Sequence, residues 1–143
     1  MYIQDSSILL VEDNPDDEKL TLRAMRMSEL PGEIRVAHDG AEALELLLNS
    51  EKLPSLVVLD LKLPKVSGLE VLQKLRENDR TKRLPIVVLT SSDEERDISE
   101  SYSLGANSYV RKPVDFDAFL SAVKQLGTYW MSLNEPPVKL ASA

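Results

Sequence analysis

Short runs of apolar residues alternate along the chain with longer segments that repeat apolar residues at helical spacing. Three runs, at residues 8–11, 56–59 and 86–89, are continuous and consist only of Ile, Leu and Val. Strands show this pattern when helices cover both faces of their sheet, because every side chain is then buried. Weaker runs at 34–37 and 108–110 predict two further strands. The pattern therefore indicates a buried parallel sheet.

The segments between the strands are predicted to be helices, and several of their ends are marked by capping residues. The first helix is expected to start at Asn14-Pro15, with acidic residues in its first turn. Gly105 is expected to stop a later helix. Capping-box spacing is found at two more helix starts, Asp39 to Glu42 and Ser92 to Glu95.

The Asp39-Gly40 pair is also a common hairpin turn, but the apolar residues after it keep helical period, so the helix is preferred. The last helix carries the apolar positions of residues 116–126. Strands and helices thus alternate in a (βα)5 pattern. Right-handed crossovers turn this pattern into an α/β three-layer sandwich around a parallel sheet. We assign residues 1–128 to this domain and residues 129–143 to a C-terminal tail.

Length, charge and composition narrow the class of protein. The chain has 143 residues, which suits one domain, and it lacks cysteine, which excludes disulfides and thiolate chemistry. Its net charge of −7 disfavours non-specific binding to DNA or to anionic membranes. Its apolar runs are too short to span a bilayer. We therefore expect a soluble protein of the cytoplasm.

A carboxylate, Asp60, directly follows the buried run LVVL, where an unpaired charge would be costly. Sites of open parallel sheets form beyond the carboxyl ends of the strands, so Asp60 is expected at a rim. Glu12 and Asp13 follow the first strand, and Thr90 and Lys112 end later ones. These side chains are therefore predicted to meet at one edge of the sheet.

The carboxylates of this predicted edge would repel one another unless a cation neutralised them. Hard oxygen ligands that leave room for water suit Mg²⁺, which is the cofactor we expect. With that charge screened, Asp60 can attack a phosphoryl group. Lys112 and the hydroxyl of Thr90 would stabilise the charge on the transferring oxygens.

The motifs VEDN, LVVLD, LPKVSG, VVLTSS and YVRKP, in this order, resemble the receiver domain of two-component response regulators over residues 6–128. The resemblance implies the flavodoxin-like strand order 2-1-3-4-5 and a phosphoryl group accepted on Asp60. It implies that Mg²⁺ is held by Asp13, Asp60 and the backbone carbonyl of Lys62. Glu12, where many members have Asp, would act through metal-bound water.

The same resemblance gives roles to the residues near the later strands. Thr90 and Lys112 would bind the phosphoryl group, and Thr90 and Tyr109 would form the conformational switch. Pro113 would follow a cis peptide bond. Such a protein is a signalling phosphoprotein rather than an enzyme with its own substrate, and it catalyses only its own phosphorylation and dephosphorylation.

The tail with Tyr129 and Trp130, and the Leu-Pro-Lys after Asp60, resemble small regulators that are paired with phytochrome-type sensor kinases. The implied partners are a sensor histidine kinase or a histidine phosphotransfer protein, a downstream protein and a second copy of the chain in a homodimer. No room for a DNA-binding domain follows Trp130, so DNA is not an expected partner.

Three other readings are kept open. An aspartyl-phosphate hydrolase would want a second carboxylate two residues after Asp60, where this chain has Lys62. A flavin- or nucleotide-binding protein would need a phosphate-cradling loop after the first strand, but residues 12–17 are acidic. A receiver-like scaffold that is never phosphorylated would need none of this chemistry. His38, without metal-ligand companions, is expected in a loop.

Overall fold

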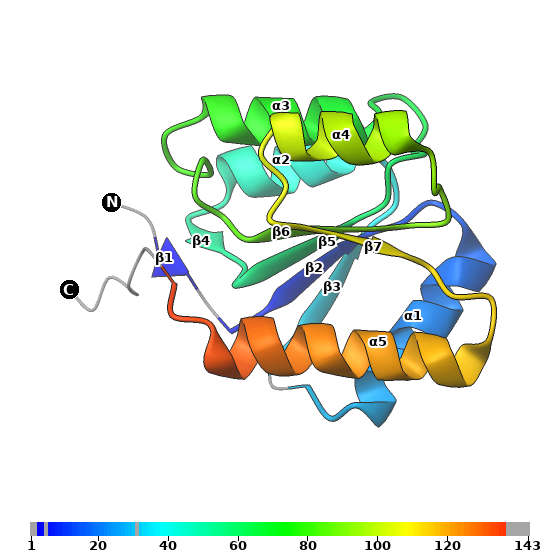
Figure 1. The fold of residues 1–143 in the computed structure, drawn as a ribbon. Coiled ribbons are helices and arrows are strands. Elements are labelled where there is room, and N and C mark those ends of the chain that lie inside the picture. The colour runs from blue at the N-terminus through cyan, green and yellow to red at the C-terminus, as the bar shows by residue number, and fades with distance from the viewer. Residues whose placement is uncertain (1–2, 5, 31, 137–143) are drawn as a thin grey trace.

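A five-stranded parallel sheet forms the middle of the molecule in the computed structural model, which describes residues 3–4, 6–30 and 32–136 (Figure 1). Its strands are β2 (Ile8–Val11), β3 (Ile34–Ala37), β5 (Leu56–Leu59), β6 (Ile86–Thr90) and β7 (Ser108–Arg111). They lie in the order β3-β2-β5-β6-β7. Numbered by themselves along the chain, these strands have the order 2-1-3-4-5, which confirms the predicted topology.

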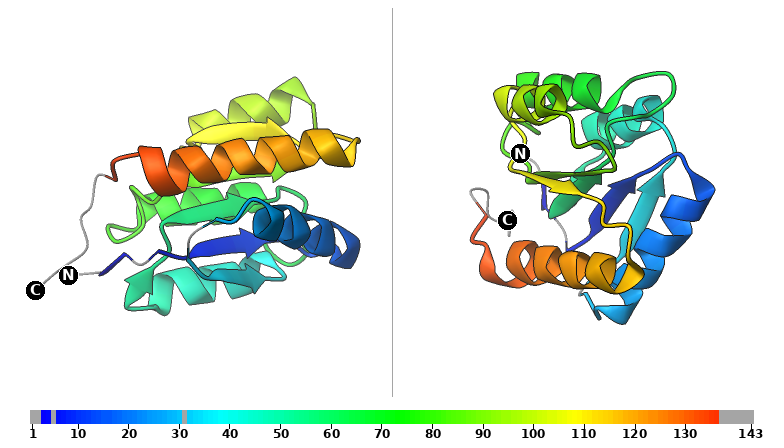
Figure 2. Two further views of the ribbon diagram at one scale, coloured as in Figure 1. Left: turned by 90° about the horizontal axis from the view of Figure 1, so that it is seen from below. Right: turned by 45° about the vertical axis from the view of Figure 1, so that its right-hand side comes forward.

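Helices cover both faces of the sheet (Figures 1 and 2). The helices α1 (Pro15–Met27) and α5 (Phe116–Thr128) lie on one face and contact each other. The helices α2 (Gly40–Asn49), α3 (Gly68–Glu77) and α4 (Glu95–Ser103) lie on the other. This is the predicted three-layer sandwich.

Alternate side chains of each central strand enter opposite halves of the core. In β2, Leu9 and Val11 belong to the cluster under α2 and α3, while Ile8 and Leu10 belong to the cluster under α1 and α5. Burying such a side chain contributes roughly 1.5–3 kcal/mol, so both faces stabilise the fold. This two-sided burial is why the strands are continuous apolar runs in the sequence.

A second, two-stranded sheet was not predicted. It pairs β1 (Ile3–Gln4) in parallel with β4 (Lys52–Leu53). Segments of two residues are too short to show a period of two, and therefore the apolar pattern gave no signal for them.

Most helix ends follow the predicted caps. The side chain of Asn14 accepts hydrogen bonds from two backbone N–H groups of α1, and Asp39 accepts one from Glu42. Gly105 has φ +101°, a left-handed conformation that suits glycine, directly after α4.

The capping box predicted from Ser92 to Glu95 is wrong. The residue before α4 is Glu94, whose side chain caps nothing. The hydroxyl of Ser92 instead donates to Asp97 (2.6 Å) and accepts from the Glu94 backbone N–H (3.3 Å). Because Ser92 lies two residues before the actual N-cap residue, Glu94, its hydroxyl joins the loop ahead of α4 to the first-turn side chain of Asp97 instead of capping a backbone N–H of the helix.

The end of the described chain continues α5 as a short π-helix, η1 (Tyr129–Leu133). Tyr129 and Trp130 thus extend the last helix, as expected, and Trp130 packs against the core cluster under α5. Residues 137–143 of the predicted tail lie outside the described residues. No helix in the described part of the chain is long and apolar enough to cross a membrane.

Candidate functional site

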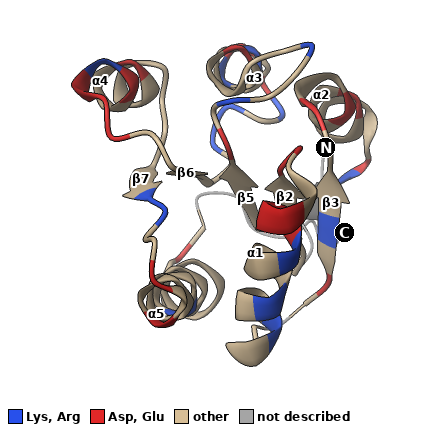
Figure 3. Ribbon diagram, turned by 90° about the vertical axis from the view of Figure 1, so that its right-hand side faces the viewer, with Lys and Arg blue, Asp and Glu red and all other residues tan. Residues whose placement is uncertain are grey.

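The carboxyl ends of four neighbouring strands bring the predicted site residues together. Because β2, β5, β6 and β7 are parallel neighbours, the residues after them emerge at one edge of the sheet. Backbone hydrogen bonds extend this register, from Asp60 N to Val11 O (3.1 Å) and from Lys112 N to Thr90 O (2.7 Å). Figure 3 faces this edge and shows acidic segments in red beside the ends of β2 and β5.

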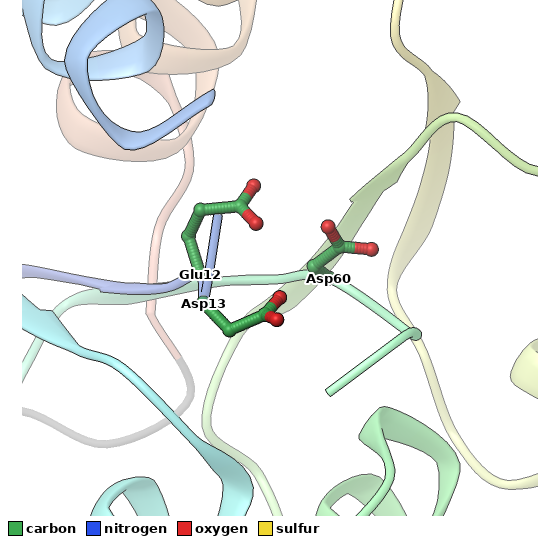
Figure 4. A group of neighbouring side chains, drawn as sticks. All are labelled: Glu12, Asp13 and Asp60. Carbon is green, nitrogen blue, oxygen red and sulfur yellow. The ribbon is translucent and has the colours of Figure 1, made fainter. Parts of the chain in front are cut away.

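Glu12, Asp13 and Asp60 form an acidic cluster at this edge (Figure 4). One carboxylate oxygen from each lies within 4.8 Å of the others. Glu12 and Asp60 are buried, whereas Asp13 is exposed and leaves one side of the cluster open to water. Oxygen ligands with an open side are the donor set that Mg²⁺ prefers. The cluster could therefore hold a divalent cation, as the sequence predicted.

The ammonium group of Lys112 contacts two carboxylates of this cluster, those of Glu12 and Asp60. Its Nζ lies 2.7 Å from Glu12 Oε1 and 3.1 Å from Asp60 Oδ2. A third ion pair, of 3.3 Å, joins it to Asp17 Oδ2 in the first turn of α1. The sequence did not predict the contact with Asp17. It showed that the first turn of α1 is acidic, but not which of its side chains faces the loop that carries Lys112.

Burial and charge change the ionisation of the pair at the centre of the site. Burial raises the pKa of Glu12 to about 7; the hydrogen bond from Lys112 opposes this rise and the charge of Asp60 adds to it. Burial lowers the pKa of Lys112, but the hydrogen bond to Glu12 and the charge of Asp60 outweigh it and raise that pKa overall. Lys112 therefore stays protonated.

Thr90 and Lys62 hold the other oxygen of Asp60. The hydroxyl of Thr90, which is fully buried, donates to Asp60 Oδ1 at 3.0 Å. The backbone N–H of Lys62 approaches the same oxygen at 3.3 Å. Together with Lys112 on Oδ2, these donors orient the Asp60 carboxylate from both sides.

Tyr109 lies on β7, the neighbour of β6, which ends at Thr90, and its side chain is partly buried. Its hydroxyl donates a 2.9 Å hydrogen bond to the backbone oxygen of Ser92. Burial raises the pKa of this hydroxyl. Tyr109 therefore links β7 to the loop that follows Thr90.

The peptide bond before Pro113 differs from the expectation. Among the described residues the structure has no cis peptide bond, so the bond from Lys112 to Pro113 is trans and the predicted cis bond is wrong. The trans form is the general preference of such bonds, by about 0.5–1 kcal/mol.

His38 lies in the loop between β3 and α2, as expected. Its Nε2 is 2.8 Å from Glu18 Oε1, and its side chain is more than half exposed. It is not one of the three residues that form the acidic cluster.

Comparison with known proteins places most of the chain in one protein family. Residues 8–124 match the model of the response regulator receiver domain. The probable methanogenesis regulatory protein FilR2 of Methanothrix harundinacea is 40% identical, over 91% of this chain and 86% of its own. The response regulator Rcp1 of Synechocystis is 36% identical, over 87% of this chain and 88% of its own.

Solved structures agree. The Mn²⁺-bound form of Rcp1 superposes with a TM-score of 0.86 at 33% identity, covering 94% of this chain and all of that one. The bacteriophytochrome response regulator AtBRR is 49% identical, with a TM-score of 0.73, covering 91% of this chain and 98% of that one. Receivers are signalling domains that take up a phosphoryl group on an aspartate. With the matching motifs, fold and carboxylate edge, this chain belongs to the response regulator receiver domain family.

Proposed function

We propose that Asp60 is the residue that accepts the phosphoryl group. The observation that carries this proposal is the fixed carboxylate of Asp60, with Thr90 on one oxygen and Lys112 on the other. Asp60 directly follows the last residue of β5, at the carboxyl edge of the sheet, and its side chain keeps a small exposed fraction of 11%. Donors already placed around the acceptor need only a local exchange of partners when negative charge arrives.

The transfer forms one bond and breaks one. An Asp60 oxygen attacks the phosphorus of a phosphohistidine and the N–P bond breaks, and the histidine ring takes up a proton from water and leaves as neutral imidazole. The product is an acyl phosphate carrying about two negative charges. Thr90 and Lys112, released from the carboxylate oxygens, then donate to the phosphoryl oxygens. Hydrolysis of the same acyl phosphate returns the protein to its starting state.

The acidic cluster would hold Mg²⁺ during this exchange. Asp13, Asp60 and the backbone carbonyl of Lys62 would be ligands, and Glu12 would act through a metal-bound water. The ion supplies positive charge at a place where carboxylates and a phosphoryl group would otherwise repel. The exposed side chain at Lys62, where an aspartyl-phosphate hydrolase would have a carboxylate, supports a signalling role over turnover of a small molecule.

The phosphoryl donor is proposed to be a sensor histidine kinase of the phytochrome type, or a histidine phosphotransfer protein that it loads. The likeness to AtBRR and Rcp1 supports this choice. The signal would leave through a rearrangement around Thr90 and Tyr109 that a downstream protein recognises. We also propose that the protein works in the cytoplasm, and as a homodimer.

Intact-mass spectrometry after incubation with acetyl phosphate and Mg²⁺ tests the assignment. We expect one phosphoryl group on the native chain, none in a chelator, and none on Asp60→Asn. Asp79→Asn, an exposed carboxylate far from the cluster in sequence, should label like the native chain. Labelling of Asp60→Asn, or undiminished labelling in the chelator, would contradict the proposal.

The kinase is tested separately, by phosphotransfer from a purified, autophosphorylated phytochrome-type kinase and from an unrelated histidine kinase. A strong rate preference for the phytochrome-type donor is expected. Equal rates would remove the phytochrome assignment and leave Asp60 as the acceptor.

A further inference from the structure

The three carboxylates that contact Lys112 differ in their exposure. The side chain of Glu12 is 2% exposed and that of Asp60 11%, but that of Asp17 is 42% exposed. We propose that Asp17 is a positioning residue for Lys112: it shares the ammonium group in the unphosphorylated protein and releases it when the phosphoryl group arrives. This inference rests on the function proposed for Asp60.

An ammonium group has three N–H donors, and here three carboxylates use them. The donor that Asp60 gives up in the reaction can pass to one phosphoryl oxygen, so a second bond from Lys112 to the phosphoryl group requires a further partner to be released. Release of Glu12 would leave a buried carboxylate without its cation, which is strongly unfavourable. Water can replace Lys112 at the exposed carboxylate of Asp17, so Asp17 is the partner that exchanges.

The position of Asp17 is fixed by the start of α1. Its backbone N–H donates to the side chain of Asn14 at 3.0 Å, which sets the first turn of the helix. Asp17 and Lys112 both line a cavity of about 280 Å³ between α1 and the loop that carries Pro113. Asp17 therefore holds Lys112 on its open side, and removal of that carboxylate should leave the ammonium more accessible and freer to follow the phosphoryl group.

Asp16→Asn is a matched control for Asp17→Asn. Both residues lie in the first turn of α1, and both donate a backbone N–H to Asn14 Oδ1. Each substitution removes one negative charge from the same helix end, so both change the net charge and the helix dipole alike. The ion pair with Lys112 belongs to Asp17. A difference between the two variants therefore measures that contact.

The first experiment measures the rate of phosphorylation by acetyl phosphate and Mg²⁺ at low and high ionic strength. We expect Asp17→Asn to react about threefold faster than Asp16→Asn, a difference equivalent to about 0.65 kcal/mol at 1.36 kcal/mol per factor of ten. The difference should persist in high salt, because a contact is screened less than a long-range field. Equal rates in the two variants, or a slower Asp17→Asn, would overturn the proposal.

The second experiment needs no phosphorylation, so it separates this inference from the function proposed for Asp60. Limiting acetic anhydride is added to each variant, and acetylation of Lys112 is followed by peptide mass mapping. We expect Lys112 to be acetylated faster in Asp17→Asn than in Asp16→Asn, with other lysines unchanged. Equal acetylation of Lys112 would overturn the proposal whatever the phosphorylation rates are. A native chain that is never phosphorylated would instead count against Asp60 as acceptor.

Discussion

The hydroxyl of Tyr109 and the backbone oxygen of Ser92 are joined by a 2.9 Å hydrogen bond that ties β7 to the loop after β6. The backbone N–H of Ser92 in turn approaches the Thr90 hydroxyl, at 3.5 Å. A phosphoryl group on Asp60 that draws Thr90 inward would therefore disturb Ser92 and Tyr109 together. The adjoining helix α4 is weakly held, since Ser101 is its only buried residue.

Replacement of Tyr109 by Phe should keep the ring and remove this bond. We expect a loss of about 1 kcal/mol of folding stability, the usual contribution of one hydrogen bond. In the unphosphorylated protein, hydrogen exchange should become faster in residues 91–94 and in α4. Tyr129→Phe, at an exposed position of η1, is the control and should change neither. Unchanged exchange in α4 would show that the Tyr109 hydroxyl does not hold the switch.

The spacing of apolar residues predicted most of the fold correctly. Capping residues and the proline bond were predicted less well. The strands at Ile8–Val11 and Leu56–Leu59 could be predicted because burial of both faces leaves an unbroken apolar run. The cap at Ser92 could not, because a serine ahead of a helix can also bond a side chain of the first turn, as Ser92 does here with Asp97 of α4. The bond before Pro113 was assigned from family likeness, against the general preference for trans.

The site itself was largely predictable, since parallel strands bring their carboxyl ends to one edge and so gather Glu12, Asp60 and Lys112. The contact of Lys112 with Asp17 was not, because it depends on the rotation of α1 about its axis. That rotation is set by packing of α1 on the sheet and on α5. A sequence shows which residues are apolar, but not which polar side chain of a first turn reaches a neighbouring loop.

Metal binding should stabilise the fold through Asp13. A ligand that binds only the folded state adds about 2.7 kcal/mol at a concentration of 100 times its Kd. We expect Mg²⁺ to raise the melting temperature of the native chain but not that of Asp13→Asn. Without metal, Asp13→Asn should be slightly more stable than the native chain, because it relieves repulsion within the acidic cluster. A Mg²⁺-dependent rise that survives in Asp13→Asn would exclude that residue as a ligand.

Arg76 should be a major source of stability at the carboxyl end of α4. Its guanidinium donates to the backbone oxygens of Gly105 (2.9 Å), Thr81 (3.1 Å) and Lys82 (3.0 Å), and to the side chain of Asn107 (2.9 Å). The bonds to Gly105 and Thr81 are partly buried, so their loss removes donors from acceptors that water reaches poorly.

We therefore expect Arg76→Met to lower the free energy of unfolding by about 2–4 kcal/mol, measured by urea denaturation. Arg83→Met, at an exposed position, should lie within about 0.5 kcal/mol of the native chain. Similar losses in both variants would argue against a specific role for the Arg76 bonds.

The cap of α2 gives a pH-dependent prediction. The hydrogen bond from the Glu42 backbone N–H lowers the pKa of Asp39 below its ordinary value of 3.8, outweighs burial, and is assisted by Lys65. A lowered pKa in the folded state means that the carboxylate stabilises the fold above pH 3.8 and loses this effect as the pH falls through the folded value. The gap in melting temperature between the native chain and Asp39→Ala should therefore shrink below pH 4. A gap that stays constant from pH 6 to 3 would contradict this assignment.

Tyr129 and Trp130 make the proposed homodimer testable, and Tyr129 does so without damage to the fold. Their rings contact edge to face, with centroids 5.0 Å apart, and both line a groove of about 510 Å³ along β7 and α5. Trp130 packs on its own core, so Trp130→Ala should cost roughly 2 kcal/mol, about half of the loss at a fully buried site. Tyr129 is 49% exposed, so Tyr129→Ala should leave the unfolding midpoint almost unchanged.

Sedimentation at micromolar concentration then separates the two effects. We expect the native chain to sediment as a dimer, because two exposed aromatic patches related by a two-fold axis can cover each other. Tyr129→Ala should be folded and monomeric, which a general loss of stability could not explain. A monomeric native chain would defeat the dimer. A dimer that persists in both Tyr129→Ala and Trp130→Ala would keep the assembly but place its contacts on a surface other than this groove.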